Sequence, residues 1–489
     1  MEYLMLCVIL FPMLASLGIW FLGMRENLQK LHKYVLFCVV ITSVVLWALV
    51  FGPQPEALPL LSLTEKLQFV LRLDGMSRVF ILIISVLWPL TTLYAFDYMA
   101  HEGGEPRFFT FFLLSYGVSA GIALAGNMVT LYLFFEMLTL ATLPLVMHKM
   151  DDKARYAGKR YLIYSMVGAA MGFISLVFLQ TYGDSNAFVL GGILPANLSP
   201  AVITNLRVAF VLAFFGFGVK AALFPMSFWL PAASVAPTPV TALLHAAAVV
   251  KAGAFACIRL TYYGFGTELL RGTFAQYIPM AFAIFTIAYG SLMALRSNHL
   301  KRRLAWSTVS NLSYILFAAL IMTNAGLLGA SMHMLAHALI KSTLFFGVGC
   351  LLVSAEKEYL DEIGGLAGRM PFTFGCFTVA SIALMGVPPM PGFFSKWAIG
   401  AAAASDGHWL ELVGIGALML SAFLTAIYLM TIVSKAFFPA DRKLQTGPSL
   451  DMPRMKWVMV SLCVIILLMG LFNRPIQACL TGWLFEGGL

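Results

Sequence analysis

Five ionisable residues lie deep inside apolar stretches of this sequence: Glu136, Lys220, Lys251, Lys341 and Lys396. A charged side chain at the centre of a membrane helix costs at least about 2.5 kcal/mol on insertion scales, so such residues are rare and mark function. Burial lowers the pKa of a lysine because it disfavours the charged form, so a buried lysine can release its proton. A neighbouring carboxylate raises that pKa again because it favours the ammonium. The five residues predict an ion path in which Glu136 controls whether Lys220 holds its proton.

A second pattern brings histidines into the same path. His333, His337 and Lys341 are spaced i, i+4, i+8 and would share one helix face over about 12 Å of rise. Imidazole can pass a proton between its two nitrogens near neutral pH, so we interpret the row as a proton relay. The alternative is a hydrogen-bonded histidine pair in a core, with the lysine reaching the interface. His245 lies six residues before Lys251, off its face, and its place in the relay stays open.

The composition of the chain indicates that these residues lie in membrane-spanning helices. The chain has 489 residues, of which 61% are hydrophobic and 11% charged, whereas soluble domains carry about 25% charged residues. We predict an all-α integral membrane protein, one domain over residues 1–489, whose first apolar segment is a membrane helix rather than a signal peptide. The fourteen predicted spans lie near 3–22, 33–51, 78–97, 108–126, 128–147, 158–181, 205–228, 238–259, 277–296, 303–323, 326–353, 372–402, 409–437 and 455–473.

Two of these spans contain a lysine beside a proline break. The seventh has Lys220 before Pro225, and the twelfth has Pro388 before Lys396. Because the two lie five spans apart, spans 4–8 and 9–13 would cross the membrane in opposite directions, and inverted repeats with interrupted helices are typical of transport sites. Two unrelated proline kinks are the alternative. The predicted repeats cover about 108–259 and about 277–437.

The distribution of basic residues predicts the orientation. Apart from the four buried lysines, 20 of the 31 lysines and arginines fall in loops on one side and seven on the other. The positive-inside rule then places both termini outside the cytoplasm. It also explains the net charge of +9 without nucleic acid, and we interpret the basic run at 301–303 as an anchor in the cytoplasmic interface.

The sequence predicts no cofactor, no metal site and no catalytic residue in this chain. Its seven cysteines form no C-x-x-C pair, and no phosphate-binding loop or dinucleotide fingerprint is present. Any enzymatic role would be that of an ion-pumping subunit in a translocating oxidoreductase, and the sequence leaves that role open.

Four segments resemble one family of membrane proteins. TPVTALLHAAAVVKAG at 238–253, KRRLAWSTVSNLSYI at 301–315, HALIKSTLFFGVG at 337–349 and GVPPMPGFFSKW at 386–397 are similar to the proton-conducting antiporter-like subunits. This family includes the large subunits of Mrp-type sodium/proton antiporters and the antiporter-like subunits of respiratory complex I and energy-converting hydrogenases. The resemblance covers roughly spans 4 to 13, and it implies fourteen helices, two inverted five-helix repeats and broken helices 7 and 12.

The resemblance also implies roles for the individual residues. Glu136 and Lys220 match the pair that gates proton uptake, and Lys251 matches the centre of a lateral polar axis. The row His333, His337 and Lys341 matches the family's eleventh-helix relay, and Lys396 matches the terminal residue of the axis. That terminal residue is lysine here, unlike the glutamate of one complex I type. No long lateral helix follows the fourteenth span, so the chain resembles shorter members such as the Mrp D subunit.

The resemblance implies a proton-translocating subunit of a multisubunit complex in a bacterial or archaeal cell membrane. Its partners would be other membrane subunits, including antiporter-like ones, and in some complexes a peripheral redox arm. Transport of sodium stays open, because Glu136 as the only buried carboxylate offers few ligands for a hard cation. Two alternatives remain. One is a stand-alone transporter of an anionic solute, with the lysines as counter-ions, and the other is a scaffold in which the buried charges have no function.

Overall fold

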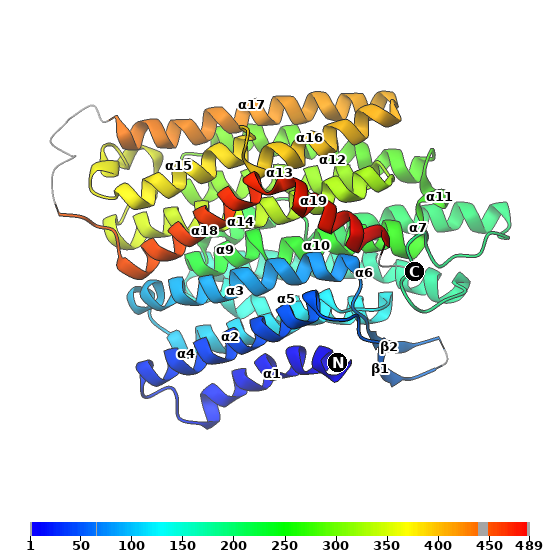
Figure 1. Ribbon diagram of the computed structural model, residues 1–489, viewed down its shortest axis with the longest axis horizontal. Helices are drawn as coiled ribbons and strands as arrows, with labels where there is room; N and C mark the ends of the chain where they lie inside the picture. Colours follow the sequence, from blue (N-terminus) through cyan, green and yellow to red (C-terminus); the bar gives the residue numbers. More distant parts are fainter. Residues whose placement is uncertain (1, 65, 439–447, 487–489) are drawn as a thin grey trace.

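The computed structural model describes residues 2–64, 66–438 and 448–486, which form a nearly all-helical bundle of roughly parallel elements (Figure 1). The described helices are α1 (Glu2–Phe21), α2 (Leu28–Phe51), α3 (Gly75–Glu102), α4 (Glu105–Ala123), α5 (Met128–Val146), α6 (Asp152–Tyr182), α7 (Pro200–Gly218), α8 (Trp229–Ala232), α9 (Thr238–Ala246), α10 (Val249–Ile258), α11 (Thr267–Leu270), α12 (Phe274–Arg296), α13 (Leu300–Leu320), α14 (Asn324–Ala355), α15 (Pro371–Met385), α16 (Pro391–Asp406), α17 (Trp409–Phe437), α18 (Pro453–Leu471) and α19 (Asn473–Thr481). Shorter turns include two π-helical segments, η2 (Arg259–Phe265) and η6 (Gly482–Glu486).

Each predicted span overlaps one helix or a pair of helix pieces, although the seventh, at 205–228, is helical only as far as Gly218. Within the described residues, eleven helices are long and apolar enough to cross a membrane, counting α9, α10 and η2 as one. The chain is therefore a multi-pass membrane protein, and the number fourteen stays a prediction. One predicted span outside the eleven, α13, is buried on nearly every side. A membrane helix that is surrounded by other helices needs no continuous apolar surface toward lipid, so its hydropathy is lower and marks it less clearly as a membrane span.

The prediction of an entirely helical chain misses one small sheet. Strands β1 (Leu58–Ser62) and β2 (Gln68–Leu71) pair antiparallel in the connection between α2 and α3, with Pro59 opposite Val70. The hairpin projects from one end of the bundle (Figure 1). The backbone N–H and C=O groups of this connection are not part of a helix, and the pairing of the two strands gives them hydrogen-bond partners.

The structure contains the two predicted helix breaks and one further break. The seventh span is interrupted between α7 and α8, and the twelfth between α15 and α16. The eighth span, predicted as one helix, is broken at Ala247–Ala248, between α9 and α10. The inverted relation between the two halves stays a prediction.

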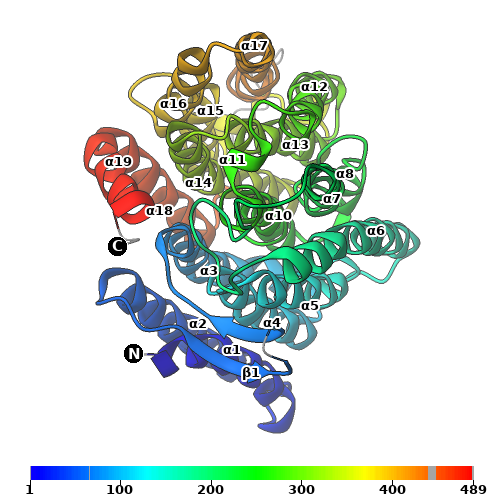
Figure 2. The ribbon, with the colours of Figure 1, turned by 90° about the vertical axis from the view of Figure 1, so that its right-hand side faces the viewer.

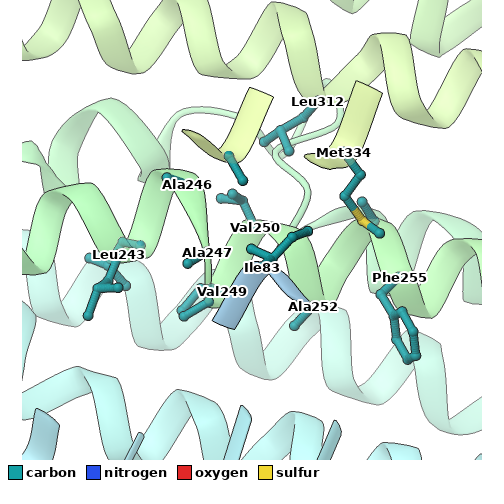
Figure 3. Packing of buried hydrophobic residues seen from close by; sticks show 14 of the residues in the cluster. Ile83, Leu243, Ala246, Ala247, Val249, Val250, Ala252, Phe255, Leu312 and Met334 are labelled. Atoms are coloured by element: carbon teal, nitrogen blue, oxygen red, sulfur yellow. The ribbon is translucent and has the colours of Figure 1, made fainter. Parts of the chain in front are cut away.

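The break between α9 and α10 lies in the most enclosed part of the bundle. The stretch from Thr238 to Phe265 is fully buried. Figure 3 shows small residues around the break, including Ala247 and Val249, packed near Ile83 of α3. At Gly253, a Cβ atom would lie 2.4 Å from the backbone nitrogen of Ala221, so a glycine is required where α10 meets the end of α7. The middle of α10 is thereby packed against the residues that follow α7.

Two of the three basic residues at 301–303 are covered by the rest of the chain, and their predicted place at the cytoplasmic interface stays a prediction. Lys301 and Arg303 are buried. The Lys301 ammonium donates a hydrogen bond to the carbonyl of Ala236 (3.1 Å), and the Arg303 guanidinium donates one to the carbonyl of Tyr428 (2.8 Å). Only Arg302 is exposed. The two buried cations join α13 to the η1 turn (Ala233–Val235) and to α17.

Candidate functional site

The predicted pair of Glu136 and Lys220 is brought together at the broken end of α7. Lys220 is the second residue after this helix and is 1% exposed, and its Nζ lies 3.5 Å from Oε1 of Glu136 on α5. The ammonium also donates a hydrogen bond to the backbone carbonyl of Phe135 and lies 3.5 Å from the centre of that ring. Glu136 itself is 29% exposed and accepts no hydrogen bond on Oε1 from the described residues. The pair is in contact, but the carboxylate is only loosely held.

Lys251 meets the histidine row across the middle of the bundle. Its Nζ lies 2.5 Å from Nδ1 of His337, and both side chains are fully buried. Lys251 is the third residue of α10, just after the break at Ala247–Ala248, whereas His337 lies in α14. Since one proton can be shared between an amine and an imidazole at this distance, the contact joins the two halves of the predicted path.

His333 continues the path toward α16. Its Nδ1 lies 3.0 Å from Oγ of Ser395, the residue next to Lys396. The rings of His333 and His337 are 5.9 Å apart, and Nε2 of each has no hydrogen-bond partner among the described residues. The two imidazoles therefore share one helix face, as predicted, without a direct hydrogen bond between them.

Lys341 leaves the histidine row and contacts α13 instead. Its ammonium donates hydrogen bonds to Oγ of Ser307 (2.7 Å) and to the carbonyl of Leu304 (3.0 Å). Ser307 in turn lies 2.6 Å from the hydroxyl of Tyr428, which lies 3.0 Å from Oγ1 of Thr425. Sequence reasoning missed this hydroxyl chain, because serine, threonine and tyrosine within apolar helices carry no distinctive spacing.

The twelfth-span lysine binds the end of a broken helix. Lys396 Nζ donates hydrogen bonds to the carbonyls of Leu384 (2.7 Å) and Met385 (3.1 Å), which lie at the C-terminus of α15. The last carbonyls of a helix lack partners within the helix and favour a cation. The side chain also lines an open groove of about 540 Å³ between α16 and α17. The break at Pro388 thus creates the carbonyl site that holds Lys396.

His245 is not connected to the other residues by a hydrogen bond. It is fully buried, and both ring nitrogens lack a partner among the described residues. Its ring lies 4.7 Å from that of Phe345. The structure leaves its predicted role as a relay member open.

The prediction that Glu136 is the only buried carboxylate is wrong. Glu411, in the first turn of α17, is 0% exposed, and neither carboxylate oxygen has a partner among the described residues. Glu105, at the start of α4, is also buried and contacts His32. Both lie at helix ends, where hydropathy does not reveal burial. The described residues contain no cluster of three or more His, Cys, Asp or Glu side chains that could hold a metal ion.

The fold defines a multi-pass membrane protein, and its core contains buried lysines and histidines. A family model described as "NADH:quinone oxidoreductase/Mrp antiporter, TM" matches residues 125–425, and one described as "NADH-Ubiquinone oxidoreductase (complex I), chain 5 N-terminus" matches residues 62–109. NADH-quinone oxidoreductase subunit N of Desulforudis audaxviator (strain MP104C) is 31% identical over 425 residues, 83% of this chain and 82% of the relative. The chain belongs to the NADH:quinone oxidoreductase/Mrp antiporter family, and the resemblance stated from its motifs is confirmed.

Solved structures share the fold over almost the whole chain. A chain of the membrane-bound sulfane sulfur reductase, an archaeal respiratory membrane complex, aligns with a TM-score of 0.85 at 22% identity, over 98% of this chain and 96% of that one. A chain of the Mrp complex from Dietzia sp. DQ12-45-1b aligns with a TM-score of 0.84 at 19% identity, over 100% of this chain and 98% of that one. At these identities the likeness concerns the fold. Both proteins are multisubunit membrane complexes.

Proposed function

We propose that this chain conducts protons along the buried path Glu136, Lys220, Lys251, His337, His333 and Lys396, with Lys341 and its hydroxyl chain as a branch. The observation that supports this most strongly is the 2.5 Å contact between Lys251 and His337. It links α10 to α14, and thus the half of the chain that carries Glu136 to the half that carries Lys396. Two buried proton-binding groups in contact have no evident structural task, since a buried cation is costly.

Transfer along this path follows from how neighbouring charges act on one another. While Glu136 lies beside Lys220, the ammonium keeps its proton, and when the partly exposed carboxylate moves or is protonated, Lys220 releases it. A proton that reaches Lys251 repels other cations in its low-dielectric surroundings, which favours transfer to His337 and onward. His333 contacts Ser395, which precedes Lys396 in α16, and the proton passes from there to Lys396. The carbonyls at the end of α15 hold the last proton until it leaves.

The path requires neighbours at both ends. Figure 2 shows α5, which carries Glu136, and α16, which carries Lys396, on opposite sides of the bundle. Glu136 is partly exposed and Lys396 lines an open groove, so further membrane subunits would complete each end. We propose a complex in a bacterial or archaeal membrane, with both termini of this chain outside the cytoplasm. The complex is either an Mrp-type antiporter or the pumping arm of a hydrogenase or complex I-like oxidoreductase.

Transport of an anionic solute is a weaker candidate. Such a site needs its cations gathered around one ligand, but the four lysines have four separate sets of partners on α5, α14, α13 and α15. Affinity purification with mass spectrometry separates the candidates. Redox subunits would indicate a pumping oxidoreductase, small membrane subunits alone would indicate an antiporter, and a lone chain that transports a solute would contradict the proposal.

The test of proton conduction uses the purified complex in liposomes with a trapped pH-sensitive dye. Replacing Lys251 by alanine is expected to slow proton flux at least about tenfold, which corresponds to ~1.4 kcal/mol in the barrier. The matched control is Lys435→Ala, which removes a half-exposed lysine that pairs with Asp361. Unchanged flux in the Lys251 variant would refute the proposal.

A further inference from the structure

An apolar groove of about 410 Å³ lies on a side of the bundle that the proton path does not use. Its walls come from α2, α3, α14 and α18, and Figure 2 shows α3 between α2 and α18. Every lining side chain is apolar, and Trp47 and Phe472 are 44% and 56% exposed. The groove is within the size range of ligand sites, about 300–1,000 Å³. Because its walls are membrane-spanning helices, its occupant must be apolar at this depth.

The C-terminal segment closes one end of this groove. Phe472, the residue before α19, and Ile476 and Leu480 within it recur every four residues, and the first two line the groove. The following turn, η6, packs on the start of α3, since a Cβ atom on Gly75 would meet the carbonyl of Trp483 at 1.8 Å. A short amphipathic helix at the ends of spanning helices is typical of the membrane interface. The closed end of the groove is therefore at headgroup level.

An arginine that forms no ion pair with the described residues lies at this closed end. Seven lysines and arginines occupy this end of the bundle, and five of them form hydrogen bonds or ion pairs: Lys66, Arg72, Arg207, Arg259 and Arg271. The guanidinium groups of Arg78 and Arg474 form neither within the described residues. Arg78 is one turn before Leu82 and two before Val86, both of which line the groove, and it lies 5.8 Å from the centre of the Trp483 ring.

From these observations we propose that the groove binds an anionic phospholipid. One acyl chain fills the space beside Trp47 and Val86, and the phosphate accepts hydrogen bonds from the Arg78 guanidinium, which suits this geometry. The nearest carboxylate along the helix, Asp74, does not compete, because Arg259 holds both of its oxygens. The lipid secures α19 and η6 against the bundle from the leaflet on that side.

Fluorescence quenching by brominated lipids tests this site in the intact complex. The complex is placed in vesicles that contain brominated phosphatidylglycerol or brominated phosphatidylcholine, and the signal of Trp47 is the difference between the wild type and Trp47→Phe. We expect phosphatidylglycerol to quench Trp47 at an about fivefold lower mole fraction, the preference that one arginine near an anionic headgroup provides. Arg78→Gln is expected to remove this preference, and Val86→Phe, which adds volume inside the groove, to reduce quenching by both lipids.

Arg474→Gln is the matched control. It removes the same charge from the same end of the bundle, but about half a helical turn away from Ile476, which faces the groove. This variant should keep the preference. Equal quenching of the wild type by both lipids would mean that Trp47 contacts the surrounding bilayer without selectivity, and it would overturn the proposal. Absence of quenching by either lipid, as when another subunit covers the groove, would overturn it as well, and so would loss of the preference in Arg474→Gln.

Discussion

Two buried ion pairs in this molecule differ in how firmly they are held. Arg259 binds both oxygens of Asp74 at 2.5 and 2.7 Å, donates to Ser77 as well, and is fully buried. Lys220 approaches a single oxygen of Glu136 at 3.5 Å, and that carboxylate is 29% exposed. The first pair has the geometry of a structural clamp between α3 and η2. The second has the geometry of a pair that can separate, as a switch for proton uptake requires.

Breaking the clamp should have the largest effect, on stability. Replacing Arg259 by glutamine leaves Asp74 without its cation, and removing one partner of a buried pair costs about 3–5 kcal/mol. Thermal unfolding of the purified protein in detergent measures this loss. Arg271→Gln, which breaks a half-exposed pair with Asp406, is the control and should have a small effect. Equal melting temperatures for Arg259→Gln and Arg271→Gln would show that the Arg259–Asp74 pair is not a structural clamp.

The clamp also predicts an acid sensitivity. Burial by itself raises the pKa of Asp74, but the Arg259 guanidinium and the hydrogen bonds from Ser77 hold that pKa below its usual value. The pair therefore stabilises the fold above the pKa of an unfolded aspartate, about 3.9, and its contribution is lost as the pH falls through the lower folded-state pKa. The melting temperatures of wild type and Arg259→Gln should converge with acidification. A constant difference down to the lowest pH at which the protein folds would contradict this.

Breaking the switch should affect transport and leave stability almost unchanged. We expect Glu136→Gln to slow proton flux about tenfold or more, because Lys220 loses the charge that controls its proton, and a tenfold change is ~1.4 kcal/mol. The melting temperature should stay near that of the wild type, since the carboxylate is partly exposed and accepts no hydrogen bond on Oε1 within the described residues. Flux and melting temperature measured on one preparation decide the point. A large fall in stability with normal flux would make this pair a second clamp.

The far end of the path offers a smaller test of the same distinction. Lys396→Arg keeps a cation beside the carbonyls of Leu384 and Met385 but cannot release a proton, because arginine stays charged. We expect flux to fall about fivefold, ~1 kcal/mol in the barrier, with assembly of the complex unchanged. Normal flux would show that Lys396 acts only as a fixed charge.

The hydroxyl branch should give the smallest effect. Tyr428→Phe removes only the hydroxyl between Ser307 and Thr425, and we expect an about twofold fall in flux with a changed solvent isotope effect. Tyr116→Phe is the control, since Tyr116 is equally buried and bonded to Ser43 but lies outside the path. Identical isotope effects in both variants would exclude the branch from proton transfer.

Much of the fold and some of the site could be predicted from the sequence, each for a physical reason. Apolar segments interrupted by charge predict spanning helices, and prolines such as Pro388 predict breaks because they remove a backbone donor. The break at Ala247–Ala248 could not be predicted, since alanine favours a continuous helix. The sequence also could not show that Lys341 turns to Ser307, since helical spacing predicts a shared face but not a partner on another helix.

The central claim is that Lys251 and His337 pass one proton between them, and a double-mutant cycle tests it most directly. Proton flux is measured in liposomes for the complex with Lys251→Ala, with His337→Ala and with both changes. If the two residues are consecutive steps of a single path, the double variant loses no more flux than the more severe single variant. Losses that multiply would mean two independent effects and would contradict the path proposed here.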